Sequence, residues 1–268
     1  MCELFGINSK RKVEINSYLK TFYSHSEKHY SGWGLACIYG ESVSLEKEAM
    51  KAESSFYLRQ RLAHPIIIDN AIAHIRLATV GLMCYENCHP FVKHDNMNRC
   101  WTLAHNGTIF DFPELEYYKA TQEGTTDSER ILYYIIDNIN ELQKTLKRKA
   151  NFEERFELLD NLLFKLSHKN KINLLIWDGE FLYVHYNYSD TMFVKEIDDG
   201  KIFSTRPLED DGSWHKEEFL KLLAYQNGHL VARGKHTTKE YSAPVRDWEL
   251  IRYTVYCIII FKTIYLSI

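Results

Sequence analysis

The sequence contains little proline and no stretch rich in proline, glycine and serine of the kind that links separate domains. Only 5 of the 268 residues are proline and 12 are glycine. The start of the chain also lacks the basic segment and long apolar run of a secretory leader, and position 2 is not the glycine that myristoylation requires. The 6 cysteines follow no regular spacing, which argues against a disulfide framework and predicts free thiols. We therefore expect a cytoplasmic protein with a single domain.

An excess of positive charge is likewise missing. The chain has 33 Lys and Arg against 36 Asp and Glu, so it lacks the basic character of a nucleic-acid-binding protein. The apolar segment 253–268 is interrupted by Lys262 and is shorter than the roughly 20 residues that cross a bilayer. We expect no membrane span, and we treat residues 241–268 as an apolar tail after a domain over residues 2–240. An edge strand, a contact in a homo-oligomer and a poorly ordered end remain open for this tail.

Apolar periodicity predicts strands at both ends of the domain and a pair of helices between them. Helical spacing marks four segments, and Thr126 or Asp127 can cap the third. The expected helices are 13–29, 54–63, 126–146 and 156–166. The expected strands are 1–9, 32–40, 42–49, 71–79, 99–107, 172–179, 181–187, 192–198, 201–205 and 229–235. This order is typical of an α+β fold in which helices cover sheets.

Cysteine stands directly behind the initiator methionine, in the stretch "MCELFGI". If Met1 is removed, the thiol of Cys2 and a free α-amino group share one residue. A free thiol is mostly protonated at neutral pH, and an α-amine with a pKa near 7.7–8.0 can act as its base. The alternative is that the position of one of six cysteines is accidental.

Three further stretches carry residues suited to chemistry, each beside a structural alternative. Arg76 in "HIRLATVG" can hold a carboxylate, or it can form a structural ion pair. Asn106 and Gly107 in "HNG" can donate to an oxyanion, or they can form a hairpin turn. Asp127 in "TTDSE" can pair with an ammonium group, or it can cap a helix.

In their order and spacing, Cys2, "HIRLAT", "CHPF", "HNG" and "TDSE" resemble the class II glutamine amidotransferases. These enzymes are N-terminal nucleophile hydrolases, and the resemblance implies a four-layer αββα sandwich of antiparallel sheets. The stretch "SGWGLA" and the length of the chain are similar to the YafJ-like branch, which lacks a fused synthase. Members of the family commonly carry Asp before Gly-Trp-Gly, where this chain has Ser31.

The resemblance also implies roles for individual residues. Cys2 would attack the side-chain amide of glutamine and form a γ-glutamyl thioester, with its own α-amine as the base. Arg76 would bind the α-carboxylate of the substrate, and Asp127 would bind its α-ammonium group. The oxyanion would be held by Asn106 and the N–H of Gly107. Thr79 and His89 would support the substrate, whereas we expect Trp33, His74 and His105 to belong to the core.

Several alternatives stay open at this point. The same residues would serve a hydrolase of γ-glutamyl peptides or conjugates, because only the leaving group differs. A catalytically silent module that binds amino acids or a partner is the third hypothesis. Ammonia could pass to a separate acceptor enzyme. No cofactor is implied, and we expect free thiols rather than a zinc site at the cluster of Cys84, Cys88, His89 and Cys100.

Overall fold

The computed structural model describes residues 2–78 and 81–242, which form two antiparallel sheets packed face to face. The seven-stranded sheet has the order β11-β9-β10-β1-β4-β2-β3, and the six-stranded sheet has the order β13-β12-β8-β7-β6-β5. The first sheet contains β1 (Glu3–Glu14), β2 (Gly32–Tyr39), β3 (Ser42–Glu48), β4 (Ile67–Arg76), β9 (Phe193–Ile197), β10 (Gly200–Ser204) and β11 (Trp214–Lys216). The second contains β5 (Phe91–His94), β6 (Cys100–Thr108), β7 (Lys171–Trp177), β8 (Leu182–His185), β12 (Leu223–Gln226) and β13 (His229–Arg233).

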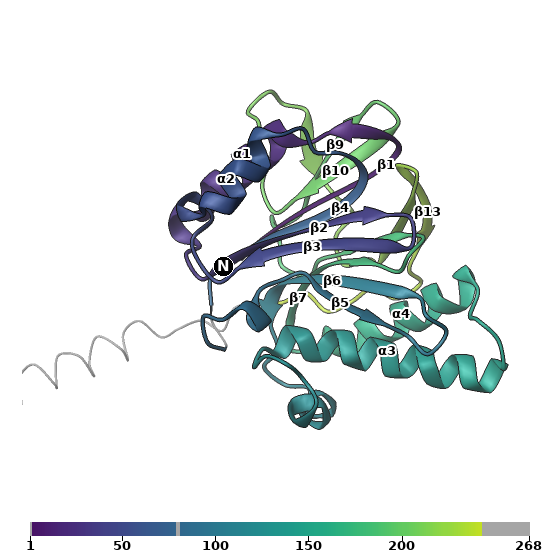
Figure 1. The fold of residues 1–268 in the computed structure, drawn as a ribbon. Coiled ribbons are helices and arrows are strands. Elements are labelled where there is room, and N and C mark those ends of the chain that lie inside the picture. Colours follow the sequence, from purple (N-terminus) through teal and green to yellow (C-terminus); the bar gives the residue numbers. More distant parts are fainter. Residues whose placement is uncertain (1, 79–80, 243–268) are drawn as a thin grey trace, which may run out of the picture.

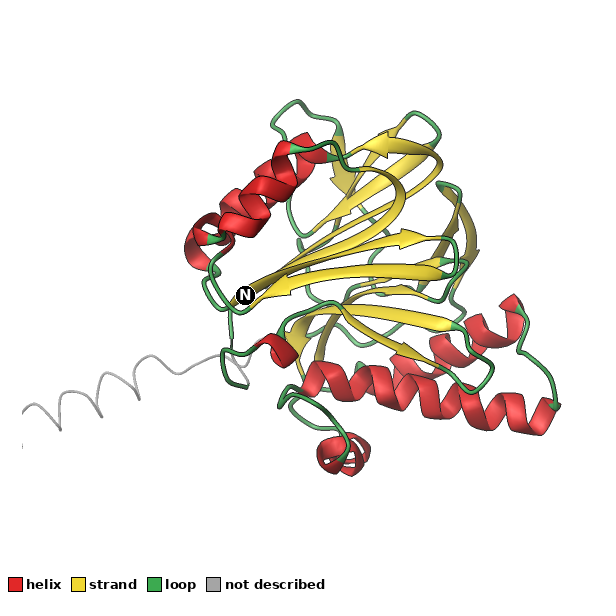
Figure 2. Cartoon of the chain, in the orientation of Figure 1, coloured by secondary structure: helices red, strands yellow, loops and turns green. Residues whose placement is uncertain are grey.

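Helices cover the outer face of each sheet, which completes the αββα arrangement (Figures 1 and 2). The seven-stranded sheet is covered by α1 (Asn16–Ser24) and α2 (Phe56–Ala63), and the six-stranded sheet by α3 (Asp127–Leu146) and α4 (Phe152–Leu166). The short 3-10 helices are η1 (His25–Lys28), η2 (Ala52–Ser54), η3 (Tyr85–Asn87) and η4 (Pro113–Ala120). The predicted fold class is therefore confirmed.

Three buried clusters follow from this layering. One lies between α3, α4 and the six-stranded sheet, and another lies between α1, α2 and the seven-stranded sheet. The third lies between the sheets, where Leu4, Ile72, Ala104 and Leu175 are completely buried. Because both faces of each sheet are covered, the central strands β4 and β7 are apolar over most of their length. The two sheets thus form a rigid support for residues at the strand ends.

Two local features differ from the sequence-based prediction. Helix α4 begins at Phe152 rather than Phe156, because Asn151 and Glu154 form a reciprocal capping box. Strand β1 continues to Glu14, and its register against β4 shifts between Asn8 and Val13. The predicted tail is described only for Tyr241 and Ser242, and its remainder lies outside the described residues.

Among the described residues, no helix combines the length and the apolar character needed to cross a bilayer.

Candidate active site

Cys2 immediately precedes β1 and lies beside the residue that follows β4. Its Sγ atom is 3.3 Å from the backbone nitrogen of Leu77 and 3.4 Å from the carbonyl oxygen of the same residue. Burial raises the pKa of the Cys2 thiol, and the Leu77 N–H and the charges of Arg76 and Lys171 act in the opposite direction. The thiol is therefore mostly protonated at neutral pH, so a nucleophilic role requires a base.

Arg76 is the last residue of β4, and its side chain is almost completely buried. The guanidinium donates hydrogen bonds to the carbonyl oxygens of Leu82, at 2.9 Å, and Gly81, at 3.3 Å. It therefore holds the loop after β4, and its charge acts on the Cys2 thiol. A positive charge that acts on the Cys2 thiol supports the predicted role of Arg76 in binding the substrate carboxylate near the nucleophile. Thr79, which the resemblance implies as a substrate-supporting residue, is outside the described residues.

Asn106 and Gly107 lie inside β6, so the hairpin turn considered for "HNG" is wrong. They stand opposite Asn173 and Ile172 of β7. An added Cβ atom at Gly107 would overlap the carbonyl oxygen of Lys171 and the ring of His105. The glycine is thus needed for close approach of two strands rather than for a bend.

The side chain of Asn106 is 1% exposed, and its Nδ2 atom has no hydrogen-bond partner among the described residues. A buried amide donor without a partner costs free energy in the folded state, and most native proteins avoid it. Such a donor is available to a ligand oxygen, which is the property that an oxyanion site needs.

Asp127 is the first residue of α3, but Thr126 is the residue that caps this helix. The Thr126 hydroxyl accepts a hydrogen bond from the backbone nitrogen of Glu129 at 3.3 Å. The Asp127 Oδ2 atom accepts a hydrogen bond from the backbone nitrogen of Ile109 at 2.7 Å. This bond ties the start of α3 to the segment two residues after Gly107. The carboxylate and the predicted oxyanion donors are therefore held together.

Lys171 is a residue of this region that the sequence analysis did not identify. It is the first residue of β7 and is 6% exposed, and its charge acts on the Cys2 thiol. Burial lowers the pKa of Lys171 to about 8, and the charge of Cys2 opposes this shift. A lysine at the start of an apolar strand usually lies in solvent, so the sequence offered no signal for its burial.

Asn87 was also missed, and it connects two loops of the site. The side chain is completely buried, and Nδ2 donates to the carbonyl oxygen of Leu82 and to the hydroxyl of Thr125, both at 2.9 Å. Its Oδ1 atom accepts a hydrogen bond from the backbone nitrogen of Thr125 at 2.6 Å. The loop after β4, whose carbonyl oxygens accept hydrogen bonds from Arg76, is thereby fixed to the segment that leads into Asp127.

Ser31 holds the other end of the loop after β4. The backbone nitrogen of Ser31 donates to the carbonyl oxygen of Arg76 at 2.9 Å. Its hydroxyl accepts a hydrogen bond from the backbone nitrogen of Ala78 at 3.0 Å. A short hydroxyl side chain therefore holds this backbone at the position where the family resemblance implies Asp.

The histidines of the motifs are interior residues. His105 contacts the hydroxyl of Ser128 at 2.9 Å and the carbonyl oxygen of Lys171 at 3.0 Å. The rings of His74 and His89 lie 4.2 Å apart, and neither has a hydrogen-bond partner among the described residues. The structure thus places His74 and His105 in the core, as expected. The role of His89 in supporting the substrate stays a prediction.

Trp33 also belongs to the core, where it is completely buried and packs against Tyr23. Cys84, Cys88 and Cys100 are free thiols. Within residues 2–78 and 81–242, no group of three or more His, Cys, Asp and Glu is arranged to hold a metal ion.

Comparison with known proteins concerns the family and the fold of the chain. The family model described as "Glutamine amidotransferases class-II" matches residues 1–196. A Haemophilus influenzae protein with the provisional name of a glutamine amidotransferase is 27% identical over 266 residues, covering 90% of this chain and 89% of its own. The Escherichia coli protein with the provisional name glutamine amidotransferase YafJ is 27% identical over 185 residues, covering 68% of this chain and 71% of its own.

Solved structures share the fold. Glutamine phosphoribosylpyrophosphate amidotransferase from Bacillus subtilis superposes with a TM-score of 0.61 at 20% identity. The match covers 86% of this chain and 48% of the other. At 20% sequence identity, this similarity shows that the two proteins share the arrangement of sheets and helices, and nothing more is inferred from it.

Proposed function

The chain belongs to the class II glutamine amidotransferases, and on this premise we propose that it hydrolyses the side-chain amide of glutamine through a γ-glutamyl thioester on Cys2. The observation that carries the proposal is the environment of the Cys2 thiol. Arg76 from the seven-stranded sheet and Lys171 from the six-stranded sheet both act on its charge. The backbone carbonyl oxygen of Lys171 lies against Gly107, which supports a common site for Cys2 and the predicted oxyanion residues.

The proposed reaction uses each residue for a separate task. After removal of Met1, the α-amine of Cys2 takes the thiol proton, and the thiolate attacks the γ-carbonyl carbon of glutamine. Asn106 Nδ2 and the Gly107 N–H stabilise the oxyanion of the tetrahedral intermediate. The C–N bond breaks, and the α-ammonium group returns the proton to the departing ammonia. Water then cleaves the thioester, which yields glutamate and restores the thiol.

Arg76 and Asp127 would bind the amino-acid head of the substrate. A bidentate guanidinium suits the α-carboxylate, and a carboxylate suits the α-ammonium group. The buried side chains of both residues are anchored by backbone contacts, which would hold their charged groups in place before substrate binds. The free thiols of the described residues support the accompanying proposal of a reducing, cytoplasmic environment.

The test is the intact mass of the purified full chain before and after treatment with 6-diazo-5-oxo-norleucine, an electrophilic analogue of glutamine. We expect loss of Met1 and one covalent adduct, together with release of ammonia from glutamine. Cys2→Ala should give no adduct and no ammonia. Cys84→Ala is the matched control, because Cys84 is a partly exposed thiol that is not predicted to react. Retention of Met1 without an adduct would contradict the proposal and favour a silent binding module.

A further inference from the structure

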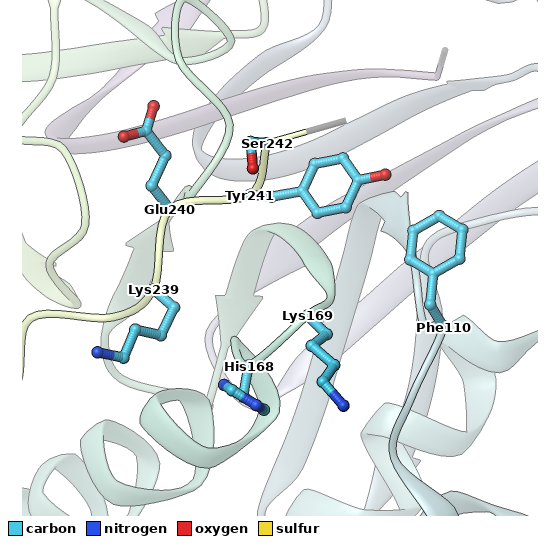
Figure 3. Close-up of a pocket in the computed structure, with 7 residues that line it drawn as sticks. All are labelled: Phe110, His168, Lys169, Lys239, Glu240, Tyr241 and Ser242. Atoms are coloured by element: carbon cyan, nitrogen blue, oxygen red, sulfur yellow. The ribbon is translucent and has the colours of Figure 1, made fainter. Parts of the chain in front are cut away.

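Glu3, the residue directly after the proposed nucleophile, carries a buried carboxylate. Charged side chains normally stay in water, as those of Lys169 and Lys239 do in the wall of a surface cavity (Figure 3). The side chain of Glu3, in contrast, is only 1% exposed. Taking a carboxylate out of water costs free energy unless the group is paired and hydrogen-bonded. The reaction proposed above gives this carboxylate no task.

Basic side chains from two separate segments surround the carboxylate of Glu3. The Nδ1 atom of His25 lies 2.8 Å from Oε2, and the ring nitrogen is the donor because a carboxylate only accepts. The guanidinium of Arg206 pairs with Oε1 through its Nη2 atom. The Nε2 atom of His29 lies farther away, at 3.7 Å from Oε1. Both carboxylate oxygens are therefore engaged, and their partners come from different parts of the chain.

One of the two partner segments is the turn that follows β10. The backbone nitrogen of Leu4 donates to the hydroxyl of Thr205 at 2.8 Å, and the backbone nitrogen of Thr205 donates to the carbonyl oxygen of Leu4 at 3.0 Å. Arg206 is the next residue along the chain. Its pair with Glu3 therefore extends this attachment of β1 by one residue towards the N-terminus.

The other partner segment, η1 and the residues after it, supports the loop after β4. His25 is the first residue of η1, and Ser31 follows the end of this short helix. Ser31 makes hydrogen bonds to the backbone on both sides of Leu77. The backbone nitrogen of Leu77 in turn lies 3.3 Å from the Sγ atom of Cys2. The carboxylate of Glu3 thus joins the first strand to the segment that holds the neighbour of the thiol.

Cys2 lies before the first paired residue of β1. The register of β1 against β4 begins at Glu3, and its register against β10 begins at Phe5. After removal of Met1, Cys2 would be the terminal residue of the chain. Terminal residues are poorly ordered unless they are tied down. The side chain of Glu3 is the attachment that stands nearest to the proposed nucleophile along β1.

Resting on the proposed function, we propose that Glu3 is a positioning residue that holds the terminal Cys2 in the orientation required for attack on the substrate. Successive side chains of a strand point to opposite faces, and Leu4 lies between the two sheets, so the carboxylate of Glu3 lies on the other face. It acts on Cys2 through the backbone and touches no reacting atom. Arg76 and Asp127 are held by contacts of their own, which do not involve this carboxylate.

The first variant is Glu3→Gln, which keeps the size of the side chain. A glutamine amide has one acceptor oxygen where the carboxylate has two, so it cannot satisfy both His25 and Arg206. We expect kcat for glutamine and the rate of inactivation by 6-diazo-5-oxo-norleucine to fall about ten- to a hundred-fold, since a displacement of about 1 Å can cost a hundred-fold in rate. KM should be nearly unchanged, because the groups that bind the amino-acid head stay in place. Intact mass establishes that Met1 has been removed from each protein that is compared.

Arg206→Gln tests the same link from the side of the partner. The Arg206 side chain is about half exposed, so this variant should fold even if Glu3→Gln does not. It should lower kcat in the same direction, and the double variant should lose no more than Glu3→Gln alone, because residues in contact are not additive. The matched control is Arg233→Gln, which breaks a surface pair with Glu218 on the edge strand β13 and should leave kcat and KM unchanged.

An unchanged kcat in Arg206→Gln, or in a folded Glu3→Gln, would overturn the positioning role and leave the proposed function intact. A rise in KM with an unchanged kcat would overturn it as well, and would assign the carboxylate to the substrate-binding loop. Additive losses in the double variant would show that the two residues act separately, which contradicts a shared attachment. If the unsubstituted full chain neither reacts with the inhibitor nor releases ammonia, the proposed function and the positioning role are both overturned.

Discussion

At the scale of single residues, replacing Asn106 should affect catalysis much more than it affects stability. Its Nδ2 atom is buried without a partner among the described residues, so removing it abolishes no protein hydrogen bond made by that donor. We expect Asn106→Ala to change the melting temperature by only a few degrees. The variant should lower kcat for the preferred substrate about 10²–10³-fold, as loss of one oxyanion donor does in other acyl-transfer enzymes.

The measurement is steady-state kinetics combined with thermal unfolding. Asn161→Ala is the matched control, because the Asn161 amide donates to a backbone carbonyl within α4, away from the site. A rise in KM with an unchanged kcat would assign Asn106 to ground-state binding and would contradict the oxyanion role.

Residue types and their order identified most of the candidate site from the sequence, but only those residues whose chemistry is visible in a motif. Cys2, Arg76, Asn106 and Asp127 stand in short stretches with recognisable neighbours. Lys171 stands in no such stretch, and its burial depends on the pairing of β7 with β6. Asn87 is one of many asparagines, and its importance arises from hydrogen bonds to residues as far away as Thr125. Contacts between residues that are distant in the sequence cannot be predicted from local sequence patterns.

At the scale of elements, two loops determine whether the predicted binding residues face each other. The loop after β4 presents the carbonyl oxygens of Gly81 and Leu82 to Arg76, and the segment before α3 leads into Asp127. Asn87 joins the two through Leu82 and Thr125. Asn87 therefore helps to fix the separation between Arg76 and Asp127, the predicted carboxylate-binding and ammonium-binding residues.

We expect Asn87→Ala to lower the free energy of unfolding by about 2 kcal/mol, because three hydrogen bonds are lost and the backbone nitrogen of Thr125 loses its partner. The value of KM should rise about ten-fold, since Arg76 and Asp127 would no longer be fixed relative to each other. Urea unfolding and steady-state kinetics test both parts. Asn138→Ala is the control, because its amide contacts only the carbonyl oxygen of Tyr134 within α3. Lower stability with an unchanged KM would restrict Asn87 to a structural role.

Most elements were predicted from the sequence, including the four-residue strand β8 (Leu182–His185), but three short strands were not. Helices α1, α2 and α3 and strands β2, β3, β7 and β9 lie where periodicity placed them. Strands β5, β11 and β12 have only three or four residues, too few for alternation to be distinguished from a loop. The alternative of a hairpin turn at "HNG" is wrong, because Asn-Gly is a turn signal only when the strand ends there. Here a close neighbouring strand, rather than a bend, explains the glycine.

At the scale of the whole molecule, the pairing of strands is what the sequence leaves undetermined. Alternation of apolar residues indicates which face of a strand is buried, but it does not identify the neighbouring strand. Strand β1 pairs with β4 and with β10, so Phe5 stands opposite both Ala73 and Ser204. The layered arrangement was predicted through the family resemblance, and its strand order was not.

The enclosed architecture also has a consequence for the response to acid. Among the almost completely buried histidines are His74, His89, His105 and His185. Burial lowers the pKa of each, and that of His185 falls to about 4. In the unfolded chain a histidine has a pKa near 6.5. Between these values the unfolded state binds more protons, so the stability of the fold must decrease as the pH falls below about 6.5.

A histidine that stays neutral in the folded state costs about 1.4 kcal/mol at pH 5.5 relative to pH 7.5. Each further histidine that stays neutral adds to this loss, which is large against the roughly 5–15 kcal/mol stability of an ordinary domain. We expect the urea midpoint of the full chain to fall steeply between pH 7.5 and pH 5.5. His74→Leu should flatten this dependence, because it removes one titrating group whose ring nitrogens have no hydrogen-bond partner among the described residues. His94→Gln, at an exposed position, should leave it unchanged. A midpoint that is constant over this range would show that protonated histidines are accommodated inside the fold, and would contradict their lowered pKa values.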